Sequence, residues 1–211
     1  MVKVAVFVFD LMDTLIDDPF LRTVRHSIKS ADLRRFIDAK DNDAFLNFES
    51  GFISETEFFR RFFLPNSEID DLPTPQRLKQ KMLQQVEWLP GVAELLSQLT
   101  GPKILASNYS VWYQDIFRQR TDIEPHFDYL FFSCEVGHRK PDRLFFEPIH
   151  QLIQAEFSNE SIIFFDDRQE NLAEPTKLGW HTVHINKHQA ASMMANSLHQ
   201  LGLITIDANY D

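Results

Sequence analysis

Residues 4–9, Val-Ala-Val-Phe-Val-Phe, form an uninterrupted apolar run that stops at Asp10. The run is β-branched and aromatic without polar alternation, which is typical of a strand buried on both faces of a parallel sheet. Four later runs also favour strands, the last more weakly: 103–107, 129–132, 161–165 and 181–185. Amphipathic segments of helical length separate them: 91–99, 111–120, 142–155 and 168–178. This alternation predicts an α/β fold with a Rossmann-like parallel sheet.

One region breaks the alternation of strands and helices. Residues 17–87 contain helical-period segments such as 20–39 and 54–63, with no convincing buried strand. We therefore expect an inserted helical cap over residues 17–87. Residues 1–16 and 88–211 are expected to form the Rossmann-like core.

Charge and cysteine content exclude several classes of function. The chain has 211 residues, with 21 basic and 31 acidic side chains, so its formal net charge is −10. An acidic surface would be repelled by a nucleic-acid backbone or an anionic membrane, so neither is expected as a partner. The single cysteine, Cys134, rules out an intrachain disulfide. No apolar run approaches the length that spans a bilayer, so we expect a cytoplasmic protein.

Polar side chains follow the predicted strands at the edge of the sheet where open α/β folds bind ligands. They are Asp10 after the first strand, Ser107 and Asn108 at the second, Lys140 in the loop before the fourth, and Asp166 and Asp167 at the fourth. One strand end thus supplies a carboxylate, another a hydroxyl with an amide, and another an acidic pair. We expect these groups to meet at one site, although Asp166 and Asp167 alone would also suit a helix N-cap.

This combination of groups suits phosphoryl transfer. Asp10 can attack a phosphoryl group to give an aspartyl phosphate. Hard oxygen ligands from Asp10, Asp166 and Asp167 suit Mg²⁺, which binds one or two carboxylates together with water and substrate oxygens. Ser107 and Lys140 would hold the remaining phosphoryl oxygens, and the backbone N–H groups after Asp10 would form an anion nest.

The motifs, taken in order, resemble a known family. The pattern Asp10-x-x-x-Thr14, Ser107-Asn108, Lys140-Pro141 and Asp166-Asp167-x-x-x-Asn171 resembles the four motifs of the haloacid dehalogenase-like (HAD) hydrolase superfamily. The segments 10–20, 108–113 and 139–142 look most like its flavin mononucleotide hydrolase-like branch. The resemblance implies a C1-type cap and a Mg²⁺-dependent phosphatase that hydrolyses a small phosphomonoester, such as flavin mononucleotide, through an aspartyl phosphate.

One position departs from the family pattern Asp-x-Asp-Gly-Thr, in which the second Asp is the general acid and base. Met12 occupies that place, and Asp13 stands where Gly is usual. Met12 cannot carry a proton, although its backbone carbonyl can still bind Mg²⁺. Asp13 is the nearest replacement donor, with a purely structural hydrogen-bonding role as the alternative.

Aromatic side chains after the second strand suggest the substrate. Trp112 and Tyr113, together with Ser107, Asn108 and Lys140, are expected to bind it. A flat ring would stack on such aromatics. Two other functions stay open: a metal-independent 2-haloacid dehalogenase, in which Asp10 attacks carbon, and a non-catalytic protein that binds phosphate or a partner.

Overall fold

A five-stranded parallel sheet forms the centre of the molecule, in the order β3-β2-β1-β4-β5. The computed structural model describes residues 5–157 and 160–205. The strands are β1 (Ala5–Phe9), β2 (Lys103–Ser107), β3 (Tyr129–Phe132), β4 (Ser161–Asp166) and β5 (His181–His184). Each predicted strand is therefore present. Val4 of the first prediction lies outside the described residues.

The central position of β1 brings the site residues together. β1 pairs with β2 on one side, with Phe7 opposite Lys103, and with β4 on the other, with Ala5 opposite Ser161. Along the chain, β2 and β3 are added on one side of β1 and then β4 and β5 on its other side, so the strand order reverses direction at β1. Ligands bind open α/β sheets at such a switch point, and the carboxyl ends of β1, β2 and β4 meet there.

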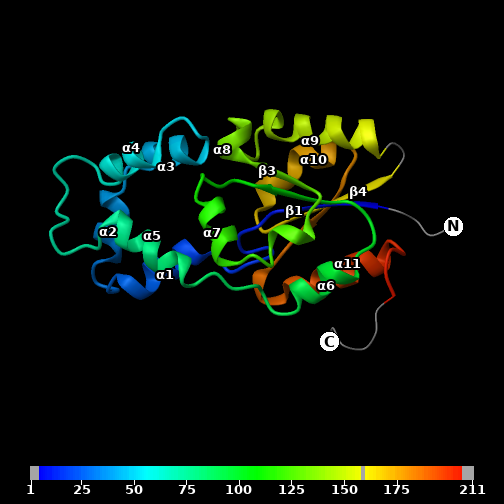
Figure 1. Cartoon of the computed structure of the whole chain (residues 1–211), viewed down its shortest axis with the longest axis horizontal. Helices are drawn as coiled ribbons and strands as arrows, with labels where there is room; N and C mark the ends of the chain where they lie inside the picture. Colours follow the sequence, from blue (N-terminus) through cyan, green and yellow to red (C-terminus); the bar gives the residue numbers. More distant parts are fainter. Residues whose placement is uncertain (1–4, 158–159, 206–211) are drawn as a thin grey trace.

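Alternating side chains of β1 enter two separate apolar cores, because successive side chains of a strand point to opposite faces. Val6 and Val8 pack with helix α9 (Arg143–Glu156), whereas Phe7 and Phe9 belong to the core that also includes Phe36 and Phe58 of the segment 17–87. Figure 1 shows α9 and α10 on one side of the sheet and α6 and α11 on the other. The helices of this part are α6 (Val92–Gln98), α7 (Tyr113–Gln119), α8 (Ser133–Val136), α9 (Arg143–Glu156), α10 (Ala173–Lys177) and α11 (Ala190–Gln200), with short 3₁₀ turns η1 (Glu124–His126), η2 (Gln169–Leu172) and η3 (Lys187–Gln189).

Five helices lie between β1 and α6 and gather at one end of the molecule (Figure 1). They are α1 (Pro19–Ser27), α2 (Leu33–Ala39), α3 (Asn42–Glu49), α4 (Glu55–Arg61) and α5 (Pro75–Leu83). Side-chain oxygens of Asp18, Asp41, Ser54 and Thr74 cap the N-termini of α1, α3, α4 and α5. The expected helix over 20–39 is thus two helices, because α1 ends at Ser27 before α2 begins.

The chain leaves and re-enters the sheet region through two adjacent segments. The backbone N–H of Asp17 donates to the carbonyl of Glu87 at 3.1 Å, and Leu89 N–H donates to the carbonyl of Leu15 at 2.9 Å. This crossing lies near the predicted boundaries at 16/17 and 87/88, and the division into cap and core stays a prediction. None of the described helices combines the length and the apolar character that crossing a bilayer requires.

Candidate active site

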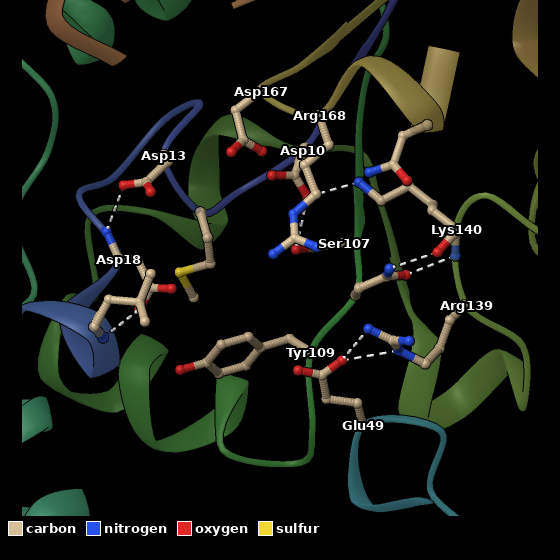
Figure 2. A pocket seen from close by; sticks show the side chains of 14 residues that line it. Asp10, Asp13, Asp18, Glu49, Ser107, Tyr109, Arg139, Lys140, Asp167 and Arg168 are labelled. Atoms are coloured by element: carbon tan, nitrogen blue, oxygen red, sulfur yellow. Dashed lines mark hydrogen bonds and ion pairs between the residues drawn. The ribbon is translucent and has the colours of Figure 1, made fainter. Parts of the chain in front are cut away.

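Lys140 connects the ends of two strands through its buried ammonium group. Its Nζ lies 2.7 Å from Asp10 Oδ1 and 2.6 Å from Asp166 Oδ2, and the Lys140 side chain is 1% exposed. Ser107, the last residue of β2, donates its hydroxyl to the same Asp10 oxygen at 3.0 Å. Figure 2 shows Asp10, Ser107 and Lys140 facing one cavity. Four residues distant in sequence therefore form one hydrogen-bonded network.

The charges in this network stabilise one another. Burial alone would lower the pKa of Lys140, but the negative charges of Asp10 and Asp166 outweigh it and raise the pKa. Burial raises the pKa of Asp10, and the Lys140 ammonium opposes that rise. Lys140 thus stays cationic. Both hydrogen bonds to Asp10 use Oδ1, so Asp10 Oδ2 has no bonded partner within residues 5–157 and 160–205.

Asp166 is held more firmly than its neighbour Asp167. The buried carboxylate of Asp166 accepts from Lys140, from the backbone N–H of Arg168 at 2.8 Å, and from Asn171 Nδ2 at 2.9 and 3.0 Å. Asn171 lies in the η2 turn after β4, which places its side-chain amide against Asp166. Asp166 is therefore saturated with donors.

The half-buried Asp167 completes a group of three carboxylates. Oxygens of Asp10, Asp166 and Asp167 lie within 4.8 Å of one another. Burial, together with the negative charges of Asp10 and Asp166, raises the pKa of Asp167 to about 7. The single positive charge of Lys140 is thus too small to balance three ionised carboxylates. A hard divalent cation fits this donor set, because it would neutralise the remaining negative charge with the ligand type it prefers.

Asn108 holds the backbone of Lys140. Its Oδ1 accepts from the Lys140 backbone N–H at 2.7 Å, and its Nδ2 donates to the Lys140 carbonyl at 2.9 Å. Asn108 was expected to bind substrate. It lines the cavity, yet the bonds that its side chain makes serve to position Lys140.

The turn after Asp10 shows why glycine is usual at the position of Asp13. Asp13 has a φ of 55°, in the left-handed region that favours glycine and that Asp tolerates better than most residues. Its Oδ1 accepts from Asp18 N–H at 3.0 Å and from Lys187 Nζ at 2.9 Å. Its backbone N–H donates to Ile16 at 2.7 Å, so that N–H is not available to the expected anion nest. The other backbone bonds of this turn run from the N–H groups of Leu15 and Ile16 to the carbonyl of Leu11, so none of the three uses the carbonyl of Met12.

Two clefts meet at this site. The first, of about 560 Å³, is polar and contains the charged network; it is called the catalytic cleft below. It is lined by Asp10, Met12, Asp13, Asp18, Leu21, Glu49, Ser107, Asn108, Tyr109, Arg139, Lys140, Asp167, Arg168 and Asn171. The second, of about 440 Å³, is called the aromatic cleft; it is lined by Asp18, Phe20, Phe45, Phe48, Glu49, Phe58, Tyr109, Ser110 and Trp112. Asp18, Glu49 and Tyr109 line both and mark their boundary.

The two aromatic residues expected to bind substrate have different surroundings. Trp112 lines the aromatic cleft, and its indole N–H donates to Glu55 at 2.5 Å. The ring of Tyr113 stacks on Phe132 at 3.8 Å between centroids, and its hydroxyl donates to Glu135. Tyr113 is not among the residues lining either cleft. We therefore leave it out of the proposed site.

Several lining residues were not among the expected ones. Arg139 binds Glu49 of α3 through Nε at 2.8 Å and Nη2 at 2.6 Å. Arg168 and Asp18 also line the catalytic cleft (Figure 2). Arg139 and Arg168 each adjoin an expected site residue, which is the signal that could have found them, and Asp18 has the sequence position of a helix N-cap. Glu49 carries no such signal, because only the packing of the cap brings it here.

Comparison with known proteins agrees with this geometry. Residues 4–174 match the haloacid dehalogenase-like hydrolase family. The chain is 29% identical over 180 residues to flavin mononucleotide hydrolase 1 of Arabidopsis thaliana, covering 84% of this chain and 70% of that protein. The magnesium-bound HAD-hydrolase YfnB of Bacillus subtilis has the same fold, with TM-score 0.69, 16% identity, and 95% of this chain and 99% of that one covered.

A dehalogenase has this fold as well. L-2-haloacid dehalogenase of Xanthobacter autotrophicus matches with TM-score 0.62 and 11% identity, over 92% of this chain and 84% of that one. Likeness at this level shows the fold alone and does not separate phosphoryl transfer from dehalogenation. The family match covers most of the chain, from β1 to α10, and the motif residues meet at one sheet edge. The chain therefore belongs to the haloacid dehalogenase-like hydrolase family.

Proposed function

We propose that this hydrolase is a Mg²⁺-dependent phosphatase acting on a small phosphomonoester. The observation that carries the proposal is the group of three carboxylates built around the ammonium of Lys140. A 2-haloacid dehalogenase needs no metal, so it gives no reason for the excess negative charge at Asp167. A non-catalytic binding protein would also not need a carboxylate oxygen on Asp10 that is left without a hydrogen-bond partner in the described part of the chain.

Asp10 would act as the nucleophile. Its Oδ1 is held by Ser107 and Lys140, which leaves Oδ2 to attack phosphorus. The third N–H of Lys140 can donate to a phosphoryl oxygen and stabilise the negative charge of the transition state, whereas Ser107 can do so only by turning its single hydroxyl proton away from Asp10. Arg168, which lines the same cleft, would add a second cation. Water would then hydrolyse the aspartyl phosphate.

Asp10, Asp167 and the backbone carbonyl of Met12 would bind Mg²⁺. Asp166 would contribute less to metal binding, because its oxygens already accept hydrogen bonds from three residues. When bound, the ion supplies charge neutralisation and orientation for the phosphoryl group. Asp167 is the ligand with fewest competing donors, because Asp166 already accepts from Lys140, Arg168 and Asn171.

The aromatic cleft would bind the organic part of the substrate. Phe20, Phe45, Phe48, Phe58 and Trp112 line it beside the catalytic cleft. Flat rings pack well against such faces, and the Arabidopsis relative is named a flavin mononucleotide hydrolase. Flavin mononucleotide or a similar aromatic monophosphate is therefore the proposed substrate.

Phosphate release tests the proposal directly. The wild-type chain is assayed on flavin mononucleotide, glucose 6-phosphate and p-nitrophenyl phosphate, with Mg²⁺ and with EDTA. We expect release only with Mg²⁺ and the highest kcat/KM for flavin mononucleotide. Chloride release from 2-chloropropionate in EDTA would favour the dehalogenase instead, and absence of both activities would favour a binding protein.

A further inference from the structure

The boundary between the two clefts is where a proton donor is needed. If phosphorus lies at Asp10 and the organic part of the substrate lies in the aromatic cleft, the ester oxygen between them lies near residues that line both clefts. These are Asp18, Glu49 and Tyr109. Each carries an ionisable group, whereas Met12 at the usual position of the acid carries none. This reasoning rests on the proposed phosphatase function.

Two of these groups are otherwise engaged. Burial raises the pKa of Glu49, but its Oε2 accepts both hydrogen bonds from Arg139, and that cation opposes the rise. The hydroxyl of Tyr109 donates to the sulfur of Met82 at 3.5 Å, and burial raises its pKa well above its usual value. Such a weak acid would protonate an alkoxide inefficiently near neutral pH.

Asp13, the donor expected from sequence, is bonded elsewhere. Its Oδ1 accepts both from the ammonium of Lys187 and from the N–H of Asp18. Lys187 also contacts Asp17 at 2.8 Å, so this ion pair joins η3 to the cap junction. The Asp13 carboxylate therefore faces an ammonium, a contact that Asp18 does not make among the described residues.

Asp18 has the arrangement that a proton donor needs. Its Oδ1 accepts the N–H groups of Phe20 and Leu21 at 2.8 and 3.0 Å, which caps α1. Its Oδ2 has no hydrogen-bond partner among the described residues, and no lysine, arginine or histidine there forms a salt bridge with it. A neutral carboxyl can therefore keep the helix cap on Oδ1 and carry its proton on Oδ2. Figure 2 shows Asp13 and Asp18 on the opposite side of the cavity from Lys140 and Arg139.

We propose that Asp18 is the general acid of this enzyme and takes the role that Met12 cannot fill. As Asp10 Oδ2 bonds to phosphorus, the bond from phosphorus to the ester oxygen breaks, and its electron pair stays on that oxygen. The Asp18 carboxyl gives this oxygen its proton and becomes a carboxylate. That carboxylate then accepts a proton from the water that hydrolyses the aspartyl phosphate, which restores the acid.

The surroundings of Asp18 support this role. Burial raises the pKa of Asp18 to about 6, and the negative charges of Asp13 and Asp17 act in the same direction. Glu49 and Tyr109 face the same boundary, and Lys187 is engaged with Asp13 and Asp17. A carboxyl of this strength is protonated in a useful fraction of molecules near neutral pH.

Leaving-group dependence tests the assignment. Flavin mononucleotide expels an alkyl alkoxide that needs a proton, whereas p-nitrophenyl phosphate expels a stable phenolate that hardly does. We expect Asp18→Asn to lower kcat/KM on flavin mononucleotide about 10² to 10³-fold, and kcat/KM on p-nitrophenyl phosphate less than about 5-fold, because kcat/KM reports formation of the aspartyl phosphate and not its hydrolysis. Asn caps helices as well as Asp does, so α1 should keep its N-terminus. Asp18→Ser, another good cap without a carboxyl, repeats the test if the Asn variant folds poorly.

Asp13→Asn is the matched control, because Asp13 precedes Asp18 in the same loop and lies on the same side of the cavity. It should slow both esters by similar factors or neither. An equal loss of kcat/KM on both esters with Asp18→Asn, or a selective loss with Asp13→Asn, would overturn the assignment to Asp18 while leaving the phosphatase intact. Failure of the wild-type chain to release phosphate from either ester with Mg²⁺ would instead overturn the proposed function and this assignment with it.

Discussion

The catalytic cleft and the aromatic cleft adjoin each other but are built by opposite physical means. In the first, charged groups from β1, β4 and the 137–142 loop are fixed by directional bonds of 2.6 to 3.0 Å around Lys140. In the second, rings of cap helices pack face to face and edge to face, as Phe58 does on Phe48 and Phe45 at centroid distances of 4.3 and 4.8 Å. A directional hydrogen-bond network loses much of its stabilising energy when one member is removed, whereas apolar packing loses stability in smaller steps.

The nucleophile is where the catalytic cleft should be most sensitive. We expect Asp10→Asn to lower kcat by at least about 10⁴-fold, because the proposed covalent step has no substitute. Asn keeps a side-chain oxygen that can accept from Ser107 and Lys140, and Asp166 still compensates the Lys140 charge, so the melting temperature should change little. The measurement is phosphate release alongside thermal unfolding, with the exposed Asp38→Asn as control. Turnover close to wild type would remove Asp10 from the mechanism.

The two adjacent aspartates should separate stability from metal dependence. Asp166→Ala removes a partner from a buried ion pair, and such losses cost about 3 to 5 kcal/mol. Asp167→Ala removes a carboxylate whose charge is uncompensated, so it should leave stability near wild type but raise the Mg²⁺ concentration for half-maximal activity by about 10-fold or more. Chemical denaturation and Mg²⁺ titrations measure these effects. Identical behaviour of the two variants would contradict the different surroundings of the two carboxylates.

The aromatic cleft should give a smaller and more selective effect. Phe20 is half-buried and lines the cleft. The substitution Phe20→Ala should lower kcat/KM for flavin mononucleotide about 10-fold. Glucose 6-phosphate should be nearly unaffected, since it offers no flat ring. Phe63→Ala is the matched control, because Phe63 is a half-buried cap phenylalanine that packs on Phe36 and Phe62 rather than on the cleft. A similar loss on both substrates would argue against ring recognition by Phe20.

The smallest expected effect is on the pH dependence of folding stability, and it comes from Asp18 at the boundary between the two clefts. Its pKa is about 6 in the folded protein against an ordinary value of 3.8, so the folded state binds the proton more tightly. Stability contributed by this group is therefore lost as pH rises from about 4 to about 6, and it stays lower above that. Asp18→Asn should flatten this dependence and gain about 1 kcal/mol at pH 7.5, discounted for partial exposure. Denaturation at pH 4 and pH 7.5 tests it, and a loss of stability at pH 7.5 would contradict it.

Much of the fold was predictable because buried parallel strands have a strong local pattern. The five predicted strands match within a residue at each described end, since apolar runs such as 129–132 are bounded by turns and charges. The cap was predictable only as a helical region. Helices α3 and α5 have local start signals in the caps Asp41 and Thr74, but the contacts of their faces are not a local property of the sequence, and the break between α1 and α2 lies inside one apparent helical period.

The site was predictable to the extent that strand ends determine position. Asp10, Ser107, Lys140 and Asp166 meet as motif order and sheet topology require. The direction of a side chain in a loop was not predictable. Asp13 turns toward Lys187, Asn108 toward the backbone of Lys140, and Tyr113 toward Phe132, because partners far away in sequence determine each orientation.

The central place of β1 has a consequence for how the chain folds. Phe7 pairs with Lys103 on one side and with Ile163 on the other, so β1 must wait for partner strands that are synthesised much later than itself. Closing such long loops costs entropy before any pairing rewards it, and folding slows accordingly. The cap helices, whose contacts are more local, can form during that delay. The strand that carries Asp10 is thus completed among the last, so a truncated nascent chain would already contain the cap segment and still lack the assembled site.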